Sequence, residues 1–222
     1  MRLRYFFFLV FGLLSFSLSA QEKPKKVFTF KIDADIDPAM NRRVKLALEE
    51  AKKNEAELIV IEMDTYGGVV TDADEIRTQI LESEIPIYVF INKDAASAGA
   101  LISIACDSIY MAPGSSIGAA TVVNGADGAA APDKYQSYMR SMMRSTAEAT
   151  GRNPKIAEGM VDEKIVIEGI SEAGSVITFS VSEAIKHGFC EGEFNSIDAI
   201  LKAQNLENAE VLAYQEDTID KI

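Results

Sequence analysis

The hydrophobic and polar positions along the chain alternate between two periods, which predicts strands and helices in turn. Residues 27–32 alternate apolar and polar side chains, and residues 58–61 form a continuous run of Leu, Ile and Val; both patterns are typical of strands. Residues 37–53 between them carry apolar side chains such as Met40 and Val44 at helical spacing. The pattern predicts a strand–helix–strand unit at the start of a domain.

The same alternation continues through the middle of the chain. We predict a helix over 72–83, a strand over 87–91, a helix over 98–105, a strand over 108–111 and a long helix over 133–150. Strands that alternate with helices favour a largely parallel sheet whose crossover connections are helical. The sequence therefore predicts an α/β domain.

Three later segments are less regular. Residues 113–132 form a loop rich in Gly and Ala, a composition typical of a mobile or substrate-contacting segment. Residues 165–178 resemble a β-hairpin that turns at 172–174, and residues 182–187 form a short helix that Gly188 ends.

The first twenty residues have the pattern of a secretory signal peptide. Arg2 and Arg4 give a basic start, and the apolar run 5–18 is shorter than the roughly 20 residues that span a bilayer. An uncleaved signal anchor stays open as an alternative, because Leu18 is a poor residue three positions before a cut after Ala20. We expect export to the periplasm, with possible residence at the membrane.

These patterns divide the chain. The predicted organisation is a signal peptide over 1–20, a linker over 21–26, one catalytic-type domain over 27–204 and a C-terminal segment over 205–222. The 222 residues are 48% hydrophobic, which suffices for one sizeable core, and the formal net charge of -12 argues against nucleic acid as a partner.

The two cysteines, Cys106 and Cys190, allow a disulfide in an exported protein. Cys106 nevertheless follows an apolar run, which favours a buried thiol. There is no Cys/His cluster with metal-ligand spacing, so we expect no metal and no cofactor.

Ser97 is the candidate nucleophile. It stands between the strand 87–91 and the helix 98–105, among Ala and Gly residues that are too small to crowd it. A serine at such a turn presents its hydroxyl at a helix N-terminus, where free N–H groups favour negative charge, as an acyl-transfer nucleophile requires. The alternative is a serine that only caps the helix.

Gly67 and Gly68 follow the strand 58–61 and let the backbone turn sharply and approach a ligand. Their N–H groups provide one half of a predicted oxyanion hole, and the N–H of Ala98 provides the other. A turn that merely needs positive φ is the competing interpretation.

Lys134 is the best candidate for the base. The one histidine, His187, lies in the last turn of a short helix, and we expect it to end that helix. Lys134 begins the long helix after the Gly/Ala-rich loop, and a lysine becomes a base when an apolar site favours its neutral form. Lys93 lies beside Asp94 and is expected to stay charged; a solvated surface lysine is the alternative for Lys134.

Four motifs in order resemble those of the NfeD-type membrane-bound serine proteases, relatives of Clp protease and of signal peptide peptidase A. They are Tyr66-Gly67-Gly68, Ala95-Ala96-Ser97-Ala98-Gly99, the run Ala112 to Ala120, and Lys134 followed by Gly151-Arg152-Asn153. The resemblance covers residues 27 to about 201.

The resemblance implies an α/β, Clp-protease/crotonase-like fold with repeated ββα turns and a mostly parallel sheet. It implies a Ser/Lys dyad of Ser97 and Lys134, with Gly68 and Ala98 holding the oxyanion. Members of this family cut apolar segments, notably the tails of stomatin-like membrane proteins, and work as homodimers or larger homo-oligomers.

The chain departs from the family pattern in two respects. Tyr66 stands where the family has proline, and longer members continue into membrane helices and a small β-barrel domain. Two other functions stay open: a non-catalytic, membrane-associated scaffold that binds stomatin-like partners, and acyl-CoA chemistry on the same fold.

Overall fold

A computed structural model describes residues 23–215, so the predicted signal peptide lies outside the described residues. Its centre is an eight-stranded sheet in the order β6-β5-β3-β2-β1-β8, in which β4 lies beside β3 and β7 beside β4. The strands are β1 (Lys26–Ile32), β2 (Leu58–Thr65), β3 (Ile87–Ala96), β4 (Ser108–Met111), β5 (Ser116–Gly118), β6 (Thr178–Ser180), β7 (Gly192–Glu193) and β8 (Glu210–Ala213).

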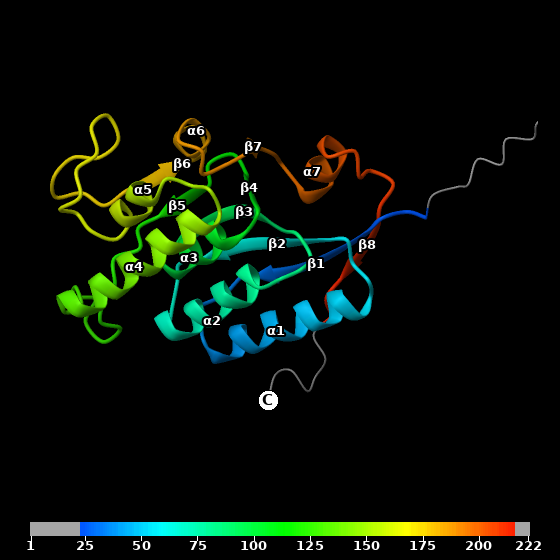
Figure 1. The fold of residues 1–222 in the computed structure, drawn as a ribbon, viewed down its shortest axis with the longest axis horizontal. Helices are drawn as coiled ribbons and strands as arrows, with labels where there is room; N and C mark the ends of the chain where they lie inside the picture. Colours follow the sequence, from blue (N-terminus) through cyan, green and yellow to red (C-terminus); the bar gives the residue numbers. More distant parts are fainter. Residues whose placement is uncertain (1–22, 216–222) are drawn as a thin grey trace, which may run out of the picture.

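Seven helices accompany these strands within residues 23–215 (Figure 1). They are α1 (Pro38–Lys53), α2 (Val70–Leu81), α3 (Ala98–Ala105), α4 (Asp133–Ala149), α5 (Pro154–Gly159), α6 (Val181–Lys186) and α7 (Ile197–Ala203). Every pairing in the sheet is parallel except that of β5 with β6. The predicted α/β class with a mostly parallel sheet is confirmed.

The alternation of side chains along β1 and β2 sends apolar groups to both faces of the sheet. Phe28 and Ile61 belong to the large core cluster, which α1, α2, α3 and α4 complete on one face. Val27 and Val60 belong to a smaller cluster on the other face, together with Ile200 of α7. Burial on both faces explains why the predicted strand at 58–61 is an unbroken apolar run.

Strands β2 and β3 run further than the apolar runs indicate. β2 continues to Thr65 and β3 to Ala96, and the pair Thr65↔Ala95 follows a register shift after Met63. The extensions carry the chain directly to Gly67 and Ser97. Half-buried polar residues such as Asp94 hid them from a hydrophobicity pattern.

The predicted hairpin over 165–178 is wrong. Ile167 and Ser171 make a single antiparallel bridge, and the Ser171 hydroxyl takes the hydrogen bonds that a ladder would need. It accepts from the Ile167 N–H at 3.0 Å and donates to the Ile165 carbonyl at 3.0 Å. The strand that does form, β6, pairs instead with β5, which arises inside the predicted loop 113–132.

Strand β8 was not predicted. It pairs in parallel with β1, from Lys26↔Glu210 to Thr29↔Ala213, so the segment beyond residue 204 contributes an outer strand of the sheet. No helix in the described part of the chain combines the length and hydropathy that a bilayer span needs.

The C-terminal end of α3 is held by the buried residue Arg152, which is 7% exposed. Its guanidinium donates to the Ile104 carbonyl at 3.2 Å and to the Cys106 carbonyl at 2.9 Å, and it pairs with Glu191 at 3.5 Å. Carbonyls at a helix end lack intrahelical donors, so this arginine supplies them. The motif 151–153 therefore serves the fold.

Cys106 and Cys190 are both free and buried, which confirms the prediction of buried thiols.

Candidate active site

Ser97 joins β3 to α3 in a backbone conformation that side chains other than glycine rarely adopt. Its φ is 54° and its ψ is -116°. The Ser97 N–H donates to the Gly118 carbonyl at 2.9 Å, which ties the turn to β5. A conformation of this kind costs about 1–3 kcal/mol and persists only where its surroundings impose it.

The hydroxyl of Ser97 is not used as a helix cap. Ser97 occupies the N-cap position of α3, but its side chain makes no capping hydrogen bond. The capping interpretation of this serine is therefore wrong, and the half-buried Oγ is available for chemistry.

Gly67 lies against Ser97, and there is no room for a side chain between them. A Cβ on Gly67 would lie 2.6 Å from the Ser97 Cβ and 3.0 Å from its Oγ. The Gly67 N–H donates to the Thr65 hydroxyl at 3.2 Å, and its carbonyl accepts from the Ile36 N–H at 2.8 Å. Close approach, rather than an available N–H, is thus what the structure shows at Gly67.

Gly68 lies opposite Ile36, which bonds the residues on either side of it. Ile36 forms an isolated parallel bridge with Gly68, in which the Ile36 N–H donates to Gly67 and its carbonyl accepts from the Val69 N–H at 2.7 Å. Since alternate residues of an extended segment face opposite edges, the N–H and C=O of Gly68 point away from Ile36. Gly68 lines the same cavity as Ser97.

Ala98 carries the second amide that the sequence predicts for the site. It is the first residue of α3, whose first N–H groups have no partner within the helix and lie at its positive end. Ala98 also lines the cavity. The structure therefore brings together Ser97, Gly68 and Ala98, as the sequence predicts.

The cavity has a volume of about 710 Å³ and a largely apolar lining. Its apolar wall includes Val69, Val70, Ala73, Val122, Met139 and Val176. Tyr66, which replaces the proline of the family pattern, is 79% exposed and borders the same space. A wall of this kind favours an apolar ligand.

The structure does not bring Lys134 to Ser97. Lys134 is exposed on the first turn of α4, with its Nζ 4.7 Å from the centroid of the Tyr135 ring, and it does not line the cavity. It follows residues 119–131, here called the arm, part of which borders the cavity. Movement of the arm and of the start of α4 would therefore change the position of Lys134.

The other two candidate bases have different roles. Lys93 donates to Asp64 at 3.0 Å, and this ion pair raises the pKa of the lysine, which keeps it charged as expected. His187 ends α6, and its ring stacks on Phe179 at a centroid distance of 5.2 Å. The prediction that His187 terminates a helix is confirmed.

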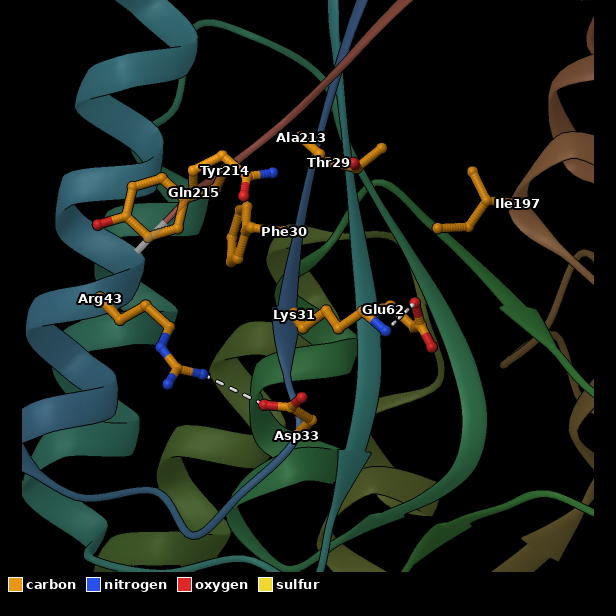
Figure 2. Close-up of a pocket in the computed structure, with 10 residues that line it drawn as sticks. All are labelled: Thr29, Phe30, Lys31, Asp33, Arg43, Glu62, Ile197, Ala213, Tyr214 and Gln215. Carbon is orange, nitrogen blue, oxygen red and sulfur yellow. Dashed lines mark hydrogen bonds and ion pairs between the residues drawn. The ribbon is translucent and has the colours of Figure 1, made fainter. Parts of the chain in front are cut away.

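A second cavity, of about 390 Å³, lies where β1, β8 and α1 meet (Figure 2). Figure 2 shows Arg43 directed to Asp33 and Lys31 directed to Glu62, and both ion pairs have N–O distances of 3.2 Å. These four charged side chains of the lining thus form two separate ion pairs. The cavity lacks a strained nucleophile beside open amides, so the Ser97 cavity is the candidate site.

Solved structures show the class to which this fold belongs. The fold matches that of the 1510-N membrane-bound stomatin-specific protease with a TM-score of 0.77 at 27% identity, covering 89% of this chain and 95% of that one. That structure is a lysine-to-alanine variant with a substrate peptide, and a serine-to-alanine variant matches with a TM-score of 0.76 at 26% identity, covering 88% and 100%. The fold also matches that of ClpP1 from Listeria monocytogenes, with a TM-score of 0.59 at 21% identity over 77% of this chain and 92% of that one. The fold is Clp-protease-like.

The sequence comparison identifies the family. Residues 26–214 match the family of the NfeD1b N-terminal domain, and the chain belongs to that family. It is 32% identical over 211 residues to the membrane protein NfeD1b of Bacillus subtilis, and 33% identical over 162 residues to the membrane-bound protease PH1510 of Pyrococcus horikoshii. These matches cover 95% and 70% of this chain but 48% and 34% of the relatives, so the chain spans about half and one third of their lengths.

Proposed function

We propose that this domain is a serine endopeptidase in which Ser97 is the nucleophile and Lys134 the general base. The observation that carries the proposal is the position of the Ser97 hydroxyl. It makes no capping hydrogen bond, it stands at a strained turn, and Ser97 lines an apolar cavity together with Gly68 and Ala98. Nucleophile and oxyanion donors in one apolar space are what acyl transfer requires. The likeness to solved structures of a protease supports this role.

The chemistry proceeds in two halves. Neutral Lys134 takes the proton of Ser97 Oγ as the oxygen attacks the scissile carbonyl, and the N–H groups of Gly68 and Ala98 receive the developing negative charge. Lys134 then protonates the leaving amine, which leaves an acyl-enzyme on Ser97. Lys134 finally takes a proton from the water that attacks this ester, and it returns that proton to Ser97 Oγ as the bond from Oγ to the acyl group breaks.

Lys134 has to leave its position over Tyr135 to do this. Its exposed side chain and its place three residues after the end of the arm make such a movement compatible with the fold. The lysine-to-alanine variant of the 1510-N protease with a substrate peptide supports the assignment of a lysine.

The proposed substrates are apolar segments of membrane proteins. The wall formed by residues such as Val70, Val122 and Met139 favours them, and the 1510-N protease is described as stomatin-specific. We extend the proposal to the tails of stomatin-like proteins, to export with membrane association, and to a homodimer or larger homo-oligomer.

A non-catalytic scaffold that binds stomatin-like partners is the second candidate. The position of Lys134 outside the cavity favours it, because the described arrangement lacks a base beside Ser97.

Cleavage of a synthetic apolar peptide with the sequence of a stomatin tail separates the two candidates. The variants are Ser97→Ala and Lys134→Ala, with Ser137→Ala and Lys155→Ala as matched controls at exposed positions of α4 and α5. Loss of cleavage in the first two, with the controls unchanged and the fold intact, supports the Ser/Lys peptidase. Cleavage by Ser97→Ala at the wild-type rate refutes it, and binding without cleavage by every form supports the scaffold.

A further inference from the structure

Gln136 connects the wall of the Ser97 cavity to the helix that carries Lys134. Its side-chain Nε2 donates to the Val122 carbonyl at 2.6 Å and to the Ala131 carbonyl at 3.2 Å. Its Oε1 accepts from the Val122 N–H at 3.0 Å. The amide group thus makes three hydrogen bonds, and two of them engage both peptide groups of one cavity-lining residue.

Gln136 also closes the arm at its base. The Ala131 N–H donates to the Val122 carbonyl at 2.9 Å, and Asn124 donates its N–H to the Ala129 carbonyl at 2.8 Å. Val123 and Ala130 lie opposite each other between these two bonds. Residues 122–131 of the arm therefore form a short antiparallel ribbon, and Gln136 holds Val122 and Ala131, the two residues at the base of that ribbon.

The ribbon leaves one edge of Val123 open. Hydrogen bonds to Ala130 are absent at this position of an antiparallel pair, so the N–H and C=O of Val123 point away from the ribbon. Val123 lines the cavity with Ser97, and the residue is 54% exposed. An extended peptide in the cavity is able to pair with this edge as an added strand.

We propose that Gln136 is a positioning residue that couples the seating of a peptide strand on the arm to the placement of Lys134. Lys134 lies two residues before Gln136 and three after Ala131. Its backbone therefore belongs to the short segment whose two ends are connected by the hydrogen bond from Gln136 to the Ala131 carbonyl. A peptide that orders the arm then also fixes the first turn of α4. This inference rests on the proposed Ser/Lys mechanism for its catalytic consequence, but the coupling itself is a property of the fold.

The chemistry of the side chain explains why glutamine serves here. A carboxamide offers donors and an acceptor in one plane, as a peptide group does, so it replaces a neighbouring strand for Val122. Glutamate keeps only the acceptor, and methionine keeps the length but neither function. Gln136→Met therefore removes all three hydrogen bonds with little change of shape.

Kinetics test the catalytic consequence with two substrates on the full chain. One is a long apolar peptide that reaches the arm, and the other is p-nitrophenyl acetate, which does not. Gln136→Met is expected to lower kcat and raise KM for the peptide, with kcat/KM falling about tenfold or more, the effect of one or two lost hydrogen bonds. Ester hydrolysis is expected to change less than about threefold, because Lys134 lies outside the cavity already when the arm is empty.

Hydrogen exchange tests the coupling without requiring any activity. In the free protein, Gln136→Met is expected to speed amide exchange about tenfold both in the arm and in residues 135–138, the first hydrogen-bonded amides of α4, whereas Ser137→Ala changes neither segment. Faster exchange in only one segment, or in neither, overturns the coupling.

The outcomes of the two experiments are distinguishable. Peptide kcat/KM within threefold of wild type, or an equal loss for peptide and ester together with a lowered melting temperature, overturns the positioning role. Absence of Ser97-dependent cleavage in the wild type overturns the proposed function, and the exchange result then decides the coupling alone.

Discussion

The contact between Gly67 and Ser97 allows a quantitative test of the site. A Cβ at Gly67 would meet the Ser97 Cβ at 2.6 Å, whereas ordinary contacts begin at 3.4 Å. Gly67→Ala therefore requires the serine or the glycine turn to shift by about 0.8 Å in a densely packed region. Because a misplacement of about 1 Å at reacting atoms costs up to 100-fold in rate, kcat/KM is expected to fall by about that factor, or about 2.7 kcal/mol.

Backbone strain has to be separated from this displacement. Gly67 has a φ of +116°, so an alanine there also loses about 1–3 kcal/mol of folding free energy. Gly114 is the matched control, since its φ is +81° but no atom lies within 4 Å of an added Cβ. Gly114→Ala is expected to lose stability to a similar degree and to keep its activity.

The assays are urea unfolding for stability and cleavage of an apolar peptide for activity. The rate at which a fluorophosphonate labels Ser97 measures the nucleophile directly, independently of peptide binding. If Gly67→Ala cleaves and labels within threefold of Gly114→Ala, the close contact does not set the position of Ser97, and our description of the site is wrong.

Three further predictions concern stability and reactivity. Arg152→Met leaves the buried Cys106 carbonyl without its donor and the Ile104 carbonyl with the Thr150 hydroxyl alone, so it is expected to lose about 1–3 kcal/mol in urea unfolding. The exposed pair broken by Arg144→Met is worth less than about 1 kcal/mol, and equal losses would contradict the assigned role. Burial raises the pKa of Cys190 to about 11 and raises that of Cys106 further. Neither thiol is therefore expected to react with Ellman's reagent near pH 8 until the protein unfolds. Rapid labelling of the folded protein would contradict this, because it would show that a thiol is accessible. Hydrogen bonds from Ser180 lower the pKa of Glu183 below 4.5, so the stabilising effect of the ionised carboxylate is present above pH 4.5 and is lost as the pH falls through the lowered pKa. The difference in unfolding free energy between the wild type and Glu183→Gln should therefore shrink on acidification. A free-energy difference that grows on acidification would refute the assignment.

Local patterns predicted the elements that bear the site. The helix over 98–105 and the strand over 108–111 have the predicted bounds, because Gly, polar and apolar residues mark their ends plainly. Ser97 and Gly68 were recognisable because small residues follow strands only where the backbone must turn closely. Short-range information was sufficient for both.

Contacts between distant segments were not predictable in this way. The bridge of Ile36 to Gly68 and the bond from Ser97 to Gly118 join residues that are far apart in sequence, and neither partner has a distinctive side chain. Strand β8 has only four residues, Glu210 to Ala213, which is too short a run to show a strand period, so its pairing with β1 rather than its own pattern identifies it as a strand. Its parallel partner determines its structure.

Lys134 marks the limit of inference from motifs. Its place at the start of a helix was predicted, and the structure has α4 beginning at Asp133. Its distance from Ser97 depends on how the arm packs, which Gln136 governs through hydrogen bonds to Val122 and Ala131. The catalytic partnership of the two residues stays a prediction.

The backbone of Ser97 has a practical consequence for capturing complexes. Glycine adopts a φ of 54° with a ψ of -116° without the penalty of about 1–3 kcal/mol that a side chain incurs there. Its greater freedom in the unfolded chain costs only about 0.5–1 kcal/mol. Replacing the nucleophile by glycine should therefore give an inert protein at least as robust as the active one, whereas the customary alanine retains the strain. Ser97→Gly is therefore the better variant than Ser97→Ala for crystallising this domain with an uncut peptide.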